Sequence, residues 1–187
     1  GLGDFSISLA KKLNNETESM PSFIARLGYT HDNGKDPFNY PSIGGGFRSF
    51  DVGLSGVKRY DPVVVYGNAF YSRANEATAS LQYKGEAPYF TGSIKPGESY
   101  GLGFGVSLAA TPDMSVDTGI TLSTAGKARL TDALGNVNYG TRSTAGYLNL
   151  GTHYLISRNL SLSVSASAGI TKDASDVILM VALPYRF

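Results

Sequence analysis

The side chains that could perform acid–base or nucleophilic chemistry are few in this chain. It has two histidines, His31 and His153, and no cysteine, which removes thiolate nucleophiles, thiolate metal sites and disulfides. His31 precedes a long polar stretch, and His153 shares a strand face with Tyr147 and Asn149. Neither has an evident partner of the kind that such catalysis requires. We therefore predict no catalytic residue and interpret the alternating serines of 160–171 as regular lining residues.

Two short motifs resemble ligand-binding loops. Asp32-Asn33-Gly34-Lys35-Asp36 offers oxygen ligands around a glycine, but it lacks the spacing and the final Glu of a calcium loop, so a plain turn is favoured. Gly101, Gly103 and Gly105 repeat every second residue with no helix after them, unlike a phosphate loop. We predict no metal and no cofactor. The three glycines share a strand face, where they either leave space for a plug or a wider pore or allow the wall to curve; both interpretations stay open.

The elements that position these residues follow a period of two. Apolar residues occupy one parity, and small or polar residues the other, over 100–110, 115–123 and 160–171, with weaker copies over 4–9 and 49–55. Such alternation places the two kinds of side chain on opposite faces of a strand. The runs are about as long as the roughly 9 to 11 residues of a tilted transmembrane strand and longer than the usual 5 or 6 of soluble sheets.

The pattern predicts nine strands in a single domain over 1–187. Their ranges are 2–12, 21–31, 47–58, 62–73, 99–110, 115–126, 144–156, 160–171 and 177–187. Tight turns alternate with longer polar links near 32–46, 74–98 and 127–142, which is the asymmetry of outer-membrane barrels, where short turns face the periplasm. Such barrels have even strand numbers. We therefore expect an antiparallel transmembrane β-barrel of which this chain is a C-terminal part, truncated at its N-terminus.

Composition and charge narrow the class of protein further. The net charge is +1, and 17% of residues are charged, so a basic surface for nucleic acid is not indicated. No apolar run reaches the roughly 20 residues of a spanning helix, and residues 1–4 lack the features of a signal peptide. Frequent glycine and tyrosine favour strands and turns. The absence of cysteine suits an envelope protein that passes an oxidising periplasm.

The final expected strand carries a second kind of signal. Its outward parity ends on Leu183, Tyr185 and Phe187. A terminal aromatic residue on an alternating apolar face resembles the signal for outer-membrane insertion, and we assign Tyr185 and Phe187 to it. The alternative is a buried sheet strand, because Ile178 and Met180 on the other parity are apolar too.

Several stretches resemble one family of outer-membrane proteins, labelled phenol-degradation meta-pathway or transporter-like and related to the secretion channel for functional amyloid. The resemblance lies in Gly1-Leu2-Gly3-Asp4, Tyr60-Asp61-Pro62-Val63-Val64, Pro96-Gly97-Glu98-Ser99-Tyr100-Gly101 and Leu183-Pro184-Tyr185-Arg186-Phe187. It implies a barrel of roughly twelve strands in the outer membrane of a Gram-negative bacterium, in which the Gly-Leu-Gly-Asp strand normally lies inside the barrel rather than at its start.

The strand parity also predicts which side chains line the lumen. These are Arg26, Asp51, Gly101, Gly103, Gly105, Asp117, Asn149, His153 and Arg186. We expect a non-enzymatic channel that passes a small hydrophobic or aromatic compound, or an exported amyloid-type polypeptide. The alternatives are a non-conducting structural or adhesion barrel and an outer-membrane enzyme. The expected partners are outer-membrane lipid, the barrel-insertion machinery and the transported substrate, with a homo-oligomer such as a trimer left open.

Overall fold

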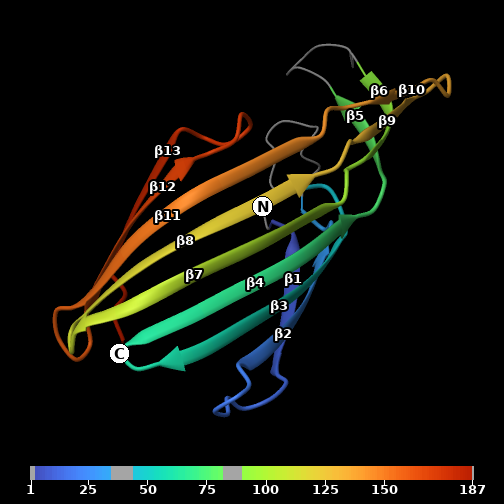
Figure 1. Ribbon diagram of the computed structural model, residues 1–187. Helices are drawn as coiled ribbons and strands as arrows, with labels where there is room; N and C mark the ends of the chain where they lie inside the picture. The colour runs from blue at the N-terminus through green and yellow to red at the C-terminus, as the bar shows by residue number, and fades with distance from the viewer. Residues whose placement is uncertain (1–2, 35–43, 82–89, 187) are drawn as a thin grey trace.

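The protein is built from strands in two antiparallel sheets, as a computed structural model shows (Figure 1). The structure describes residues 3–34, 44–81 and 90–186. No helix occurs in these ranges, and accordingly none of the described residues belongs to a helix long and apolar enough to cross a membrane. The prediction of an all-β, antiparallel chain is therefore confirmed.

The larger sheet holds the nine strands that the alternation predicted. They are β1 (Phe5–Lys12), β2 (Ser22–His31), β3 (Ser49–Tyr60), β4 (Val63–Ala74), β7 (Ser99–Thr111), β8 (Met114–Ala125), β11 (Ser143–Leu155), β12 (Ser161–Gly169) and β13 (Val177–Ala182). The sheet order is β1-β2-β3-β4-β7-β8-β11-β12-β13, so every strand pairs with its neighbours along this path. The last strand stops at Ala182 rather than continuing to residue 187, because Pro184 has no N–H to donate to a ladder.

Two of the polar links contain strands that the sequence analysis missed. The second sheet joins β5 (Ala77–Leu81), β6 (Phe90–Lys95), β9 (Arg129–Asp132) and β10 (Val137–Tyr139) in the order β10-β9-β6-β5. The pairing of β6 with β9 joins the two halves of this sheet and connects the β4–β7 link to the β8–β11 link. Figure 1 shows this small sheet projecting beyond one end of the large one. These strands have three to six residues, too few for a period of two to stand out.

The large sheet exposes its apolar face, the reverse of the usual arrangement in a soluble protein. On β7 the even-numbered residues from Tyr100 to Leu108 are exposed, whereas Gly101, Gly103 and Gly105 between them are buried. The same holds along β8, where Ile120 and Leu122 are about half exposed. In the described part of the chain no large side chain is fully buried. The apolar face is therefore the open one, and no hydrophobic core forms against it.

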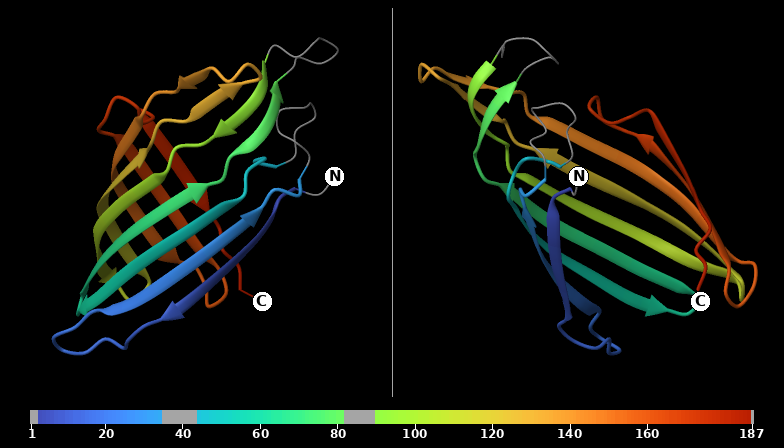
Figure 2. Two further views of the ribbon diagram at one scale, coloured as in Figure 1. Left: turned by 90° about the vertical axis from the view of Figure 1, so that its right-hand side faces the viewer. Right: turned by 180° about the vertical axis from the view of Figure 1, so that it is seen from behind.

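The large sheet is strongly coiled but not closed. Figure 2 shows its tilted strands curling around a common axis, with the β3–β4, β7–β8 and β11–β12 turns at one end and the β4–β7 and β8–β11 links at the other. Within the described residues β1 and β13 each pair on one side only, β1 with β2 and β13 with β12. The described strands thus form an open, barrel-like trough with two free edges and no closed barrel, so the expectation that they belong to a larger transmembrane barrel stays a prediction.

The β9–β10 turn yields a prediction about pH. The Asp132 carboxylate accepts hydrogen bonds from the backbone N–H groups of Leu134 and Asn136, at 2.9 and 2.8 Å, and from Nδ2 of Asn136 at 2.8 Å. These bonds, chiefly those from Asn136, lower the pKa of Asp132 below its ordinary value. The pKa of Asp132 is lower in the folded turn than in the unfolded chain. The ionised carboxylate therefore stabilises the turn at pH values above the ordinary pKa of aspartate, and this stabilisation is lost as the pH falls through the lowered pKa.

We therefore expect the amide proton resonances of Leu134 and Asn136 to titrate together in NMR spectra, with a midpoint below the roughly 3.9 of a free aspartate. In Asp132→Asn this titration should vanish. A midpoint at or above the free value would contradict the assigned hydrogen bonds.

Candidate functional site

The less exposed face of the large sheet gathers most of the predicted lining residues. The strand registers place eight of them on this inner face: Arg26, Asp51, Gly101, Gly103, Gly105, Asp117, Asn149 and His153. The registers bring Asp117, Asn149 and His153 together on the neighbouring strands β8 and β11, whereas Arg26 and Asp51 lie farther along the sheet on β2 and β3.

The glycine row does not leave open space. The registers set Gly101, Gly103 and Gly105 opposite Phe70, Asn68 and Tyr66 of β4. A Cβ atom added at Gly101 would lie 2.4 Å from the Phe70 ring, one at Gly103 would lie 2.3 Å from Oδ1 of Asn68, and one at Gly105 would lie 2.4 Å from the Tyr66 ring. The β4 side chains therefore lean over the glycines and fill the space that the missing side chains leave.

These three β4 residues were missed by the sequence analysis. The sequence pattern over 62–73 assigned no faces to that strand, and the registers place Tyr66, Asn68 and Phe70 on the inner face. The available signal was the match between a row of alternating glycines in 101–105 and a row of large side chains in 66–70. Glycine allows a neighbouring ring to lie flat against the backbone. This matching of large and small residues between strands requires the register, which the sequence did not provide.

His153 also has partners that its sequence position did not reveal. Its Nδ1 atom lies 2.7 Å from Oγ of Ser163 on β12, and its Nε2 atom lies 3.4 Å from Oδ1 of Asp117 on β8. Asp117 is folded over Gly151, because a Cβ there would lie 2.5 Å from the carboxylate. The Oδ1 atom of Asp117 is buried and accepts no hydrogen bond from the described residues. The expectation that His153 has no partner pair was wrong, since pairing of β11 with β8 and β12 supplies both.

A second polar chain lies next to this group on the inner face. The Ser167 hydroxyl donates to Oδ1 of Asn149 at 2.7 Å, and Nδ2 of Asn149 donates to Oγ1 of Thr121 at 3.2 Å. Together with the Asp117–His153–Ser163 group, it forms a band of polar side chains across β8, β11 and β12. We call these six residues the polar belt.

The Ser163, His153 and Asp117 contacts have the residue types of a nucleophilic triad. Acyl transfer also needs backbone or side-chain donors directed at a developing oxyanion. β12 is paired on both sides over Ser163–Ala168, with β11 and with β13, so its backbone N–H groups around Ser163 are engaged in the sheet. The arrangement therefore favours a polar lining over a nucleophilic centre.

The predicted residues near the C-terminus lie at the end of the sheet. Arg186 lies beside the β11–β12 turn, where its backbone N–H donates to the Asn159 carbonyl at 2.8 Å and its carbonyl accepts from Asn159 Nδ2 at 2.8 Å. It thus sits at the rim rather than along the wall. Tyr185 forms an isolated antiparallel bridge with Leu160, and Phe187 lies outside the described residues.

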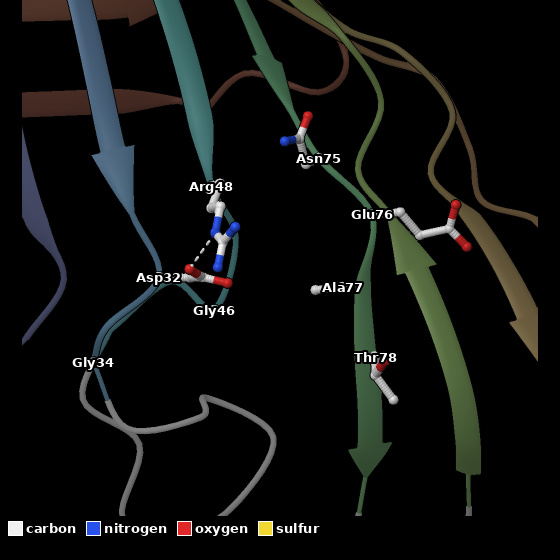
Figure 3. A pocket seen from close by; sticks show the side chains of 8 residues that line it. All are labelled: Asp32, Gly34, Gly46, Arg48, Asn75, Glu76, Ala77 and Thr78. Atoms are coloured by element: carbon white, nitrogen blue, oxygen red, sulfur yellow. Dashed lines mark hydrogen bonds and ion pairs between the residues drawn. The ribbon is translucent and has the colours of Figure 1, made fainter.

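A polar pocket opens at the end of the sheet that carries the longer links. It has a volume of about 440 Å³ and is lined by Asp32, Gly34, Gly46, Arg48, Asn75, Glu76, Ala77 and Thr78 (Figure 3). Arg48 donates to Asp32 at 2.7 Å, and this bond lowers the pKa of Asp32. Glu76 is paired with Arg129 at 3.3 Å. Because each carboxylate of the pocket already has a basic partner, the pocket is not a prepared cation site. The rest of the expected turn, Lys35 and Asp36, lies outside the described residues.

The fold and the inner face together define a class, an antiparallel all-β protein with an exposed apolar face and a hydrogen-bonded polar one. A scan against protein-family models gives no match for this chain.

Proposed function

We propose that the large sheet is the wall of a transmembrane β-barrel in a bacterial outer membrane, with the apolar face toward lipid and the polar belt toward a water-filled lumen. The observation that carries this proposal is that the apolar face of the sheet is exposed, whereas the polar face is the inner one. Soluble monomers rarely expose continuous apolar patches larger than a few hundred Å². Here Leu102, Phe104 and Ile120 on adjacent strands are all at least half exposed.

The height of the apolar face fits this proposal. On β7 it runs from Tyr100 to Leu108, which is about 26 Å along a strand at roughly 3.3 Å per residue. A tilt of about 40° reduces this to about 20 Å across the bilayer, close to the roughly 25 Å apolar band of outer-membrane barrels. Tyrosines flank the band as they do in such barrels. Tyr71 and Tyr100 are paired near the link end, and Tyr60 and Tyr154 lie near the turn end.

Closure of the wall is part of the proposal. Inside a bilayer the unpaired N–H and C=O groups of a sheet edge have no water to bind, so only closed barrels are stable there. We therefore propose that β1 and β13 pair with further strands in a wall of roughly twelve.

The proposed activity is passage of a substrate through this wall. The belt offers a carboxylate, an imidazole, an amide and three hydroxyl groups, and Tyr66 and Phe70 add flat aromatic surface beside it. Such a lining is compatible with both cargo classes raised by the sequence, a small hydrophobic or aromatic compound and an unfolded polypeptide. The barrel-insertion machinery is the proposed partner of the C-terminal segment that carries Tyr185.

Single-channel recording in planar bilayers tests the activity. The reconstituted protein is expected to give reproducible current steps. Asp117→Asn removes a negative charge from the belt, so it should shift the reversal potential in a salt gradient toward lower preference for cations. The matched variant Asp113→Asn, in the β7–β8 turn, should shift it less.

Reproducible insertion into the bilayer without conductance would contradict transport and favour the structural or adhesion alternative. Equal shifts for the two aspartate variants would contradict the assignment of Asp117 to the lumen.

A further inference from the structure

We infer that a pocket at the outward rim of β7, β8 and β11 binds the phosphate of an outer-leaflet membrane lipid. The pocket has a volume of about 440 Å³ and is lined by Gly97, Glu98, Tyr100, Gly126, Lys127 and Arg142. The inference rests on the proposed function, because it requires the apolar face of the sheet to lie in a bilayer with its longer links on the outer side.

The pocket floor is made by two glycines whose backbones approach closely. The Gly126 N–H donates to the Glu98 carbonyl at 2.8 Å. A Cβ atom at Gly97 would lie 2.1 Å from the Gly126 carbonyl oxygen, so only glycine allows the two links to pass at this distance. The crossing fixes Lys127 directly after β8, at the level where the apolar band ends.

Two cationic side chains face this pocket without a carboxylate partner. Arg142 donates to the Tyr100 hydroxyl, and its guanidinium carbon lies 5.9 Å from the centre of the Tyr100 ring. Lys127 is exposed, and no carboxylate of the described residues forms an ion pair with either cation. The one acidic side chain in the pocket, Glu98, is paired with Arg73 at 3.7 Å. A net positive site remains, and a guanidinium beside an ammonium is well suited to phosphate.

An apolar groove continues from the same tyrosine along the outward face. It has a volume of about 370 Å³, and its lining includes Val52, Leu54, Ala69, Tyr71, Tyr100 and Leu102. Ala69 lies between Leu54 of β3 and Leu102 of β7 in the ladders, and its small side chain leaves the depression. A cationic pocket joined to an apolar groove across Tyr100 matches a ligand with a phosphate at one end and hydrocarbon at the other. A free phosphate ion would use only the first part.

The inference can be tested by native mass spectrometry of the detergent-solubilised protein with bisphosphorylated lipid A as the probe. We expect saturable binding of lipid A, and clearly weaker binding of the same lipid after its phosphates are removed. Two basic side chains near a lipid phosphate together raise the affinity by about tenfold to thirtyfold. Lys127→Gln/Arg142→Gln should lose that factor. The matched double variant Lys11→Gln/Arg158→Gln, near the opposite rim, should bind as the wild type does.

Equal affinities for the two double variants, or undiminished binding of the dephosphorylated lipid, would overturn the inference. For comparison, inorganic phosphate is titrated with the protein, and we expect no broadening of the ³¹P resonance of the phosphate. Binding of this ion as tight as that of lipid A would also overturn the assignment, because the site would then serve a free anion. Insertion into phosphatidylcholine vesicles is measured first. Failure to insert defeats the proposed function itself, whereas insertion without phosphate-dependent lipid binding defeats only this inference.

Discussion

Replacing Leu150 by arginine is expected to lower the free energy of unfolding in lipid vesicles by about 2 to 4 kcal/mol, the cost of a cation near the bilayer midplane on the lipid face of a barrel. Leu150 lies in the middle of β11 on the outward face, and its side chain is 58% exposed. The measurement is urea unfolding of the vesicle-bound protein, followed by circular dichroism.

The inward residue Ser165 provides the control. It lies on β12 opposite Gly151, the residue next to Leu150, and Asp117 is opposite Gly151 on the other side. In the proposed orientation an arginine at Ser165 enters water near the Asp117 carboxylate, so we expect a much smaller loss of stability. In a water-soluble protein the order reverses, because a surface substitution at Leu150 would change stability by only about 0.5 kcal/mol. Similar costs for both variants would falsify the proposed orientation of the two faces.

Gly101→Ala should destabilise the sheet by about 1 to 3 kcal/mol, the usual cost of overpacking. A Cβ atom at this position would lie 2.4 Å from the Phe70 ring and 2.8 Å from the Leu122 carbonyl oxygen. The Phe70 ring can turn away, but Leu122 O belongs to the backbone of the paired strand. The unfolding assay described for Leu150 measures the effect.

Gly53→Ala is the matched control, because Gly53 lies on the inner face of β3 and is also paired with Phe70. The nearest atoms to its added Cβ are 3.7 and 3.8 Å away, which is ordinary contact. We expect this variant to be neutral or slightly stabilising, since alanine loses less chain entropy than glycine on folding. Equal destabilisation of both variants would mean that Phe70 does not rest on Gly101.

The sequence predicts the large sheet well because each of its strands carries its own evidence. Leu102, Phe104 and Val106 alternate with glycines within a single strand, so one segment is enough to assign the strand and its two faces. The small sheet lacks such evidence, since Arg129–Asp132 is a short strand that pairs with Val137–Tyr139 of its own link and with Phe90–Lys95 of a different link.

The candidate site was only partly predictable for a related reason. Parity placed Asp117 and His153 on one face, but their contact depends on how far β8 and β11 slide past each other. His153 is opposite Ser115 and Ser163 in the ladders, so Asp117, two residues beyond Ser115, comes within 3.4 Å of its ring. Tyr66 and Phe70 were not among the predicted lining residues, because the sequence pattern over 62–73 assigned no faces to that strand. Their position against the glycines of β7 follows from the register between β4 and β7.

The pairing of β6 with β9 has a mechanical consequence. Four residue pairs join a hairpin from one link to a hairpin from another, so the two hairpins cannot separate without breaking the hydrogen bonds between them. A displacement of one link is therefore passed to the other. The pairing couples the ends of β4 and β7 to those of β8 and β11.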